Sequence, residues 1–206
     1  MTTLAKRAAA VTVPEYSPLT ARQIAALTVL QYPHTEPAKL VEQARKEVEA
    51  LESAYEETRE AYKAESWEIL NACDRFTRAY IGVAAGMGAE YPLGHPDADH
   101  DRDSSFGPEA IHPDSLRRMV ADCQRFQREN AETLQAAYES GEVRAPNGEV
   151  EEQAGYDFYH TRNHAGVGFW EDGDWPEAEG EKLTAAAHKY GETSLTTGDD
   201  GAIYLL

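Results

Sequence analysis

Residues 156–175, YDFYHTRNHAGVGFWEDGDW, bring together side chains that could carry out acid–base chemistry. A histidine beside a carboxylate is the minimal general acid–base pair, and an arginine or an amide can stabilise negative charge that develops during a reaction. Arg162, Asn163, His164 and Asp172 supply these groups within one short stretch. One interpretation of the segment is therefore the site of a hydrolase.

A structural role explains the same residues. YDFYHT alternates with period two, RNHAG suits a turn that needs positive φ, and VGFW returns as a second strand, so the pattern predicts a β-hairpin. In that hairpin Arg162 and Asn163 would hydrogen-bond the turn and bridge to a carboxylate such as Asp157. The aromatic residues would form core and cross-strand pairs: Phe158, Tyr159, Phe169 and Trp170.

We favour the structural interpretation and assign no catalytic residue to the segment. Binding is the role that remains for side chains at its polar tip. The candidate binding residues are Tyr159, Arg162, Asn163, His164, Trp170 and Asp172.

A second candidate site lies in the acidic loop of residues 90–114. Four aspartates alternate there like the start of a calcium-binding loop, and carboxylate oxygens suit Ca²⁺. However, Arg102 stands where such a loop needs glycine, and Pro108 stands where it needs a bidentate glutamate. No paired cysteines or HExxH spacing supports zinc, and no Walker A or GxGxxG pattern supports a nucleotide. We therefore expect no cofactor and no metal, with weak metal candidates only at Asp97, Asp99, Asp101 and Asp103.

Helical periodicity dominates residues 37–141. From Val41 to Tyr62 apolar residues recur at steps of three and four, which is a heptad pattern, and after a step to Ser66 the pattern resumes as far as Tyr80. This predicts one long helix over about 37–85, or two helices joined at a kink. Residues 112–141 predict a further helix that ends at Gly141. The two would form an antiparallel helical hairpin or bundle, and a coiled-coil dimer is the alternative.

The remainder of the chain predicts a small sheet with one helix. After the hairpin of 156–170, EGEKLTAAAHKYG predicts a short helix, and TSLTT, GDDG and AIYLL predict a closing hairpin. The predicted fold class is α+β, with a C-terminal ββαββ module over 142–206. Residues 1–36 form an N-terminal segment with a short helix, and residues 37–141 form the helical region that includes the acidic loop.

Charge and composition limit the classes of function. The chain of 206 residues has 19 basic and 37 acidic residues, for a net charge of −18, which disfavours direct binding to nucleic acid or to an anionic membrane. No apolar run is long enough to span a bilayer, and the N-terminus does not resemble a secretory signal. Two cysteines are too few for a disulfide framework. We expect a cytoplasmic protein.

The C-terminal part resembles a known family. GYDFYHTRNHAGVGFWED, LTAAAHKYG and LTTGDDGAIYLL, together with the helix that carries Asp122 and Cys123, are similar to small proteins of tailed bacteriophages and prophages that have no assigned activity. The resemblance spans about residues 119–206. In the family pattern the turn histidine follows a glycine, whereas His164 directly follows Asn163. That shift argues against a mechanism that needs an imidazole at a fixed position.

The resemblance implies a phage protein in the cytoplasm of a bacterial host. The function we expect is non-enzymatic: an accessory protein that binds a host or phage protein, in counter-defence or host takeover. An acidic face that mimics DNA and binds a basic nucleic-acid-binding protein is one form of this hypothesis. The alternatives are a virion or assembly component that forms a homo-oligomer through the long helix, and a hydrolase with its site on the 156–175 hairpin.

Overall fold

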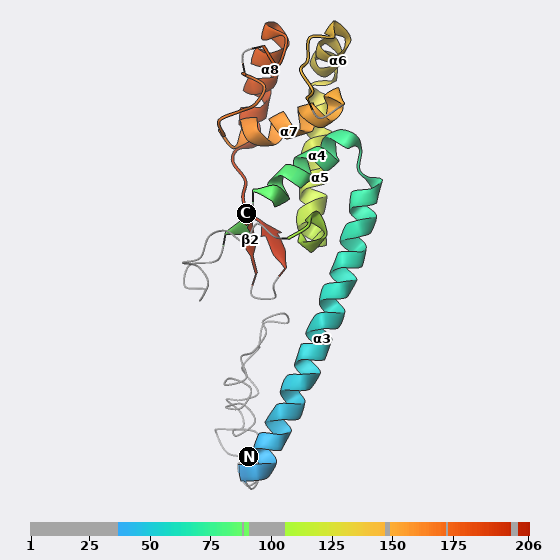
Figure 1. The fold of residues 1–206 in the computed structure, drawn as a ribbon, viewed down its shortest axis with the longest axis vertical. Helices are drawn as coiled ribbons and strands as arrows, with labels where there is room; N and C mark the ends of the chain where they lie inside the picture. Colours follow the sequence, from blue (N-terminus) through green and yellow to red (C-terminus); the bar gives the residue numbers. More distant parts are fainter. Residues whose placement is uncertain (1–36, 88, 91–105, 147–148, 172, 199–201) are drawn as a thin grey trace. The chain divides into compact units, whose positions relative to one another are not determined.

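The computed structural model describes residues 37–87, 89–90, 106–146, 149–171, 173–198 and 202–206 (Figure 1). The contacts divide the chain into two units, one of residues 1–61 with 199–201 and the other of residues 62–198 with 202–206. The predicted N-terminal helix and the aspartates of the acidic loop lie outside the described residues.

The described part of the first unit is the beginning of helix α3 (Pro37–Ala72). Its surface carries ion pairs at helical spacing, such as Arg45 with Glu42 at 3.2 Å and Arg59 with Glu56 at 3.9 Å. These side chains are largely exposed, so water screens each pair and it adds little to stability. Leu51, which belongs to the predicted heptad row, is 49% exposed.

The second unit begins with the last turns of α3 and continues into α4 (Arg75–Gly86). The break between them falls at Cys73 and Asp74, so the predicted long helix is two helices. Asp74 is the N-cap of α4, and its Oδ1 accepts a hydrogen bond from the Thr77 N–H at 2.7 Å. Burial acts to raise the pKa of Asp74, but the hydrogen bonds from Thr77 and Gln127 outweigh it and the pKa is lowered.

Among the described residues of the heptad row, the fully buried ones lie in the second unit. Ser66 is fully buried, and its hydroxyl donates to the Ile111 carbonyl at 2.8 Å. Phe76 and Tyr80 on α4 are also buried. The step of four at Ser66 therefore coincides with the point where the row becomes buried.

The predicted third helix is also two helices. Helix α5 (Pro113–Glu129) and helix α6 (Ala131–Ser140) meet at Asn130. The predicted end at Gly141 is confirmed, since Gly141 is the C-cap of α6 with φ of 71°. The buried face of these helices is an apolar row at helical spacing, formed by Leu116, Met119, Cys123, Phe126 and Leu134.

The predicted hairpin of residues 156–170 is wrong. Helix α7 (Val150–Arg162) covers the first predicted strand and the six residues before it. Almost every residue from Ala154 to Arg162 is buried, so the helix has no polar face to reveal its 3.6-residue period. A short alternation of polar and apolar residues in this segment then gives the sequence pattern of a strand. The second predicted strand, 167–170, is a turn, and the ββαββ module is therefore absent.

Gly155 explains how α7 fits against α4. A Cβ placed on Gly155 would lie 2.0 Å from the Phe76 carbonyl oxygen, which is far inside contact distance. The two helix backbones therefore approach closely at this point, and only glycine allows the approach. Glycine has a low helix propensity, so its presence makes this helix harder to predict from the sequence.

The segment after α7 inserts a ring into the core. The Phe169 N–H donates to the Thr161 hydroxyl at 3.0 Å, and Phe169 stacks on Phe126 with ring centroids 5.8 Å apart. Helix α8 (Glu177–Ala187) and a 3₁₀ turn, η2 (His188–Tyr190), follow and end at Gly191. This confirms the predicted C-terminal helix.

A small three-stranded sheet closes the second unit. Strand β2 (Leu195–Thr197) pairs antiparallel with β3 (Ile203–Leu205), which confirms the closing hairpin. Strand β1 (Ala89–Glu90) pairs in parallel with β2, a pairing that the sequence did not predict. A 3₁₀ turn, η1 (Pro108–Ala110), leads to Ile111, which forms a bridge to β3. The chain therefore combines helices with a small mixed sheet, an α+β structure.

The core of the second unit is a cluster of aromatic rings from three helices. Phe126 of α5 stacks on Phe158 of α7 with centroids 4.0 Å apart. Tyr80 and Phe76 of α4 lie 5.3 Å and 5.8 Å from Phe158. In Figure 1, α4 lies next to α7 and to α5. Helix α4 of the predicted helical region and α7 of the predicted C-terminal module therefore share one core.

Two further expectations from the sequence concern the cysteines and membrane-spanning segments. Cys123 is buried on α5 and Cys73 is partly buried, both thiols are free, and burial raises the pKa of each. Among the described residues, no helix has the length and apolar character needed to cross a membrane.

Replacing Gly155 tests the close approach of α4 and α7. We expect Gly155→Ala to lower the free energy of unfolding by about 1–3 kcal/mol, because the new methyl group would overlap the α4 backbone. Gly82→Ala is the matched control on α4, where an added Cβ meets nothing within 4 Å, and it should raise stability by about 0.5–1 kcal/mol. Urea unfolding followed by circular dichroism measures both. A Gly155→Ala protein as stable as the wild type would contradict the packing.

Candidate functional site

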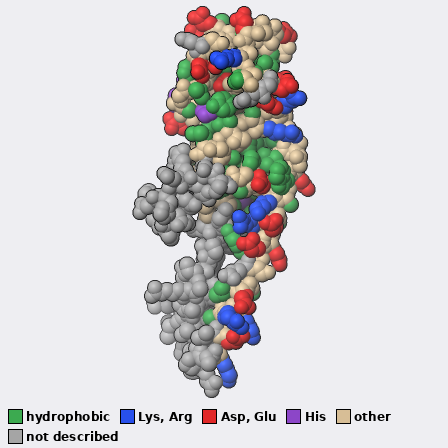
Figure 2. Space-filling model, viewed as in Figure 1, with side chains coloured by type: hydrophobic (Ala, Val, Ile, Leu, Met, Phe, Trp, Pro, Cys, Tyr) green, Lys and Arg blue, Asp and Glu red, His purple; other side chains and the backbone are tan. Residues whose placement is uncertain are grey.

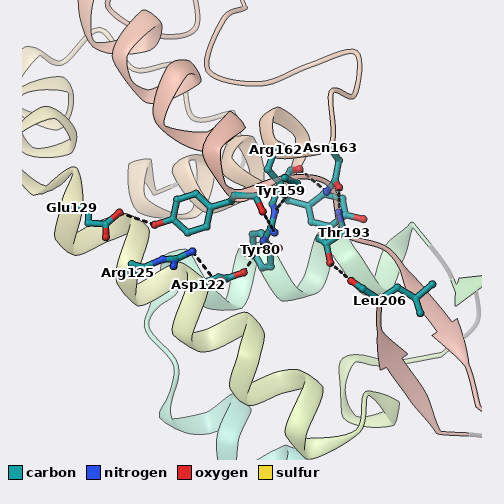
Figure 3. Close-up of polar contacts among 11 residues, drawn as sticks. Tyr80, Asp122, Arg125, Glu129, Tyr159, Arg162, Asn163, Thr193 and Leu206 are labelled. Carbon is teal, nitrogen blue, oxygen red and sulfur yellow. Dashed lines mark hydrogen bonds and ion pairs between the residues drawn. The ribbon is translucent and has the colours of Figure 1, made fainter.

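Arg162, the last residue of α7, is the centre of the polar contacts in the second unit (Figure 3). Its side chain is buried, with 4% of the residue exposed. The Nη1 group donates to the Tyr80 hydroxyl at 2.7 Å and to Asp122 Oδ2 at 3.1 Å. Nε donates to the Gly191 carbonyl at 2.9 Å, and Nη2 donates to the Tyr190 carbonyl at 3.1 Å. One guanidinium thus joins α4, α5 and the segment after α8.

Aromatic rings surround this guanidinium. Its carbon lies 5.9 Å from the ring centre of Tyr80 and 5.8 Å from those of Phe158 and Tyr190. Such distances are at the outer limit of a cation–π contact. Burial raises the pKa of Tyr80, against the opposing effect of Arg162, so the phenol stays neutral. The counter-charge for Arg162 is therefore the carboxylate of Asp122.

Asn163 fastens the end of α7 to the C-terminal segment. Its Oδ1 accepts a hydrogen bond from the Thr193 N–H at 2.7 Å, and its Nδ2 donates to the Tyr159 carbonyl at 2.9 Å. The Thr193 hydroxyl in turn donates to the Leu206 carbonyl at 3.3 Å. Both halves of the Asn163 amide are therefore engaged within the fold.

The other candidate residues divide between core and surface. Tyr159 is buried and makes an edge contact with Tyr80, with centroids 5.4 Å apart. Trp170, expected in the core, is 40% exposed. His164 is exposed at φ of 50°, and its ring lies against His188 with centroids 4.4 Å apart. Asp172 lies outside the described residues.

These positions do not assemble the constellation of a hydrolase among the described residues. Arg162 and Asn163 are engaged inside the fold, whereas His164 lies at the surface beside another imidazole. The part of the chain that the structure describes also contains no group of three or more potential metal ligands. The metal candidates from Asp97 to Asp103 lie outside it.

The predicted partnership of Arg162 with Asp157 is wrong. Residues five apart on an α-helix are separated by about 140° around its axis, so the two side chains point to different sides. Asp157 instead accepts hydrogen bonds from Trp175 Nε1 at 2.7 Å and Gln153 Nε2 at 3.0 Å. Burial raises the pKa of Asp157 to about 6 despite these bonds.

Sequence reasoning missed Asp122 as the partner of Arg162, and Arg125 as a second partner of Asp122. Both lie on α5, and Arg125 Nη2 donates to Asp122 Oδ1 at 3.4 Å. The guanidinium of Arg125 also lies 4.4 Å from the ring centre of Tyr190. A signal was available, since the resemblance extends to the helix that carries Asp122, but a single sequence gives no reason to pair a residue of α5 with one of α7.

A groove of about 350 Å³ opens beside this network. Helix α5 supplies one wall and the segment after η2 supplies the other, with Arg162 between them. Three arginines line it, together with acidic, polar and apolar groups: Arg118, Arg125, Arg162, Asp122, Glu192, Tyr190, Thr193, Ala121, Leu205 and Leu206.

Comparisons with protein-family models, curated proteins and solved structures found no match to this chain.

The buried carboxyl of Asp157 predicts a defined pH dependence. Its pKa is raised from the usual value of about 4 in an unfolded chain, so the folded protein holds the proton more tightly between pH 4 and 6. Stability from this group is present below pH 4 and is lost as the pH rises through 6. Asp157→Asn should remove that loss, so its stability relative to wild type should increase by up to about 2–3 kcal/mol from pH 4 to pH 7.

Urea unfolding of both proteins at pH 4, 5, 6 and 7 measures this difference. The asparagine can still accept the bond from Trp175, which keeps the packing comparable. A difference between the two proteins that does not change with pH would contradict the assignment.

Proposed function

We propose that this chain is a non-enzymatic accessory protein of a tailed bacteriophage that acts by binding another protein in the host cytoplasm. Counter-defence or host takeover is the role that fits the resemblance of residues 119–206 to phage proteins. The proposal is supported by how the chain uses its polar residues. Arg162 and Asn163, which were the strongest candidates for chemistry, hold the fold together.

The observation that carries the proposal is the exposure of two tryptophans in the second unit. Trp67 on α3 is 51% exposed and Trp170 after α7 is 40% exposed, whereas the rings of Phe76, Phe126 and Phe158 are almost fully buried. Tryptophan is among the residues that most often dominate the binding energy of protein interfaces. These two indole rings, which are more exposed than the ring of Tyr156 at 36%, are therefore the best candidates for a contact surface.

The net charge favours a basic partner. At −18 the chain attracts cationic surfaces and repels nucleic acid. On the face drawn in Figure 2, acidic and basic side chains are interspersed with apolar ones. This pattern supports a mixed contact surface, and mimicry of DNA by a continuous acidic face is the narrower form of the proposal.

An assembly role is the second candidate. Leu51 is an apolar residue of the heptad row on α3, and 49% of it is exposed, which favours association of this helix with another one. A protein of the virion or of its assembly pathway would form a closed ring or a trimer, which light scattering of the purified chain detects.

Capture experiments with tryptophan variants test the main proposal. Immobilised full-length chain is exposed to lysate of infected cells at two salt concentrations, and the retained proteins are quantified. We expect Trp170→Ala or Trp67→Ala to reduce the recovery of a specific partner at least tenfold, since an interface tryptophan contributes more than about 1.4 kcal/mol. Met87→Ala, which truncates another exposed apolar side chain, is the matched control and should change recovery less than twofold.

The comparison of the two salt concentrations distinguishes electrostatic binding from apolar binding. Loss of the partner at high salt would support recognition of a basic protein by the acidic chain. Equal recovery by the wild type and both tryptophan variants, with unchanged circular dichroism, would contradict the proposed surface.

A further inference from the structure

The groove beside Arg162 concentrates positive charge in a strongly acidic chain. Of the 19 basic residues, three line this groove, against two acids, Asp122 and Glu192. Helix α5 presents Arg118, Asp122 and Arg125 at intervals that place them on one side of the helix. Arg162 reaches the same space from the end of α7. In Figure 3, Asp122 lies between Arg125 and Arg162 and interacts with both.

These guanidinium groups retain donors that the fold does not use. The four bonds of Arg162 leave one N–H on Nη2 without a partner among the described residues. Among the described residues Arg118 donates a long bond, 3.4 Å to the Leu205 carbonyl, and the bond of Arg125 to Asp122 is equally long. Arg118 and Arg125 are exposed, so both can turn toward a ligand with little disturbance of the core.

The chemistry of the walls selects the class of ligand. The carboxylate of Asp122 already forms ion pairs with Arg162 and with Arg125. The donors that remain are forked guanidinium N–H groups, and these match the several oxygens and the double charge of a phosphate better than one further carboxylate. A volume of about 350 Å³ lies at the lower end of the range for small-molecule sites, roughly 300–1,000 Å³.

We propose that this groove binds a small phosphorylated compound, with its phosphoryl group between Arg118, Arg125 and the free edge of Arg162. The inference is independent of the proposed partner surface, because none of its residues is one of the exposed tryptophans. Binding here also stabilises the second unit, since the ligand bridges α5 and the segment that follows η2.

Titration of the full-length chain tests the proposal and identifies the source of the phosphoryl group. The probes are inorganic phosphate, glucose 6-phosphate and citrate, with sodium chloride at matched ionic strength as the reference. Binding is measured by isothermal calorimetry and by the shift of the melting temperature. We expect phosphate or glucose 6-phosphate to bind and to raise the melting temperature where chloride does not. Tighter binding of the sugar phosphate would identify a phosphomonoester, and equal binding would identify free phosphate.

Variants on α5 locate the site. Arg118→Gln with Arg125→Gln should weaken phosphate binding at least tenfold, while the unliganded protein keeps its circular dichroism spectrum. Arg128→Gln removes one charge from the same helix outside the groove and should change the affinity less than twofold. Equal loss in the Arg128→Gln control would show non-specific attraction and overturn the proposal. An effect of phosphate no larger than that of chloride, or a preference for citrate over both phosphates, would overturn it as well.

Discussion

A guanidinium that is removed from water must find acceptors in the protein, and Arg162 meets this requirement with four hydrogen bonds. The acceptors come from α4, α5 and the two carbonyls that end η2. None of these elements can shift without leaving a buried charge unsatisfied, so the requirement fixes where the C-terminal segment lies. Asn163, the next residue, also holds the C-terminal segment in place, because its side chain accepts a hydrogen bond from the Thr193 N–H.

The same constraint explains why the polar residues at the end of α7 serve the fold, while other parts of the surface are left for binding. Arg162 and Asn163 lie at the end of α7, where the aromatic core meets the C-terminal strands, and most of their side-chain hydrogen bonds are made within the fold. The surface that remains consists of exposed tryptophans, a large excess of acids and one groove rich in arginine. The exposed tryptophans and the excess of acids suit a protein partner, and the groove suits a small anion.

Local signals in the sequence were sufficient for the helices with two distinct faces and for the turns. The row from Leu116 to Leu134, the stop at Gly141 and the closing hairpin follow directly from periodicity and glycine. Helix α7 could not be found this way, because burial on nearly all sides removes the polar face and Gly155 lowers helix propensity. The pairing of Arg162 with Asp122 depends on the crossing of α5 and α7, which only the tertiary fold determines.

Amide hydrogen exchange in an Arg162→Met variant is the most direct test that this side chain holds the C-terminal segment in place. The account predicts that the amides of Thr193 and Leu205, which bond to Asn163 and Ser115, exchange at least tenfold faster than in wild type, while the amides of α3 keep their rates. An Arg128→Met protein, altered at an exposed arginine of α5, should behave like wild type. Unchanged protection of Thr193 and Leu205 in Arg162→Met would contradict the account.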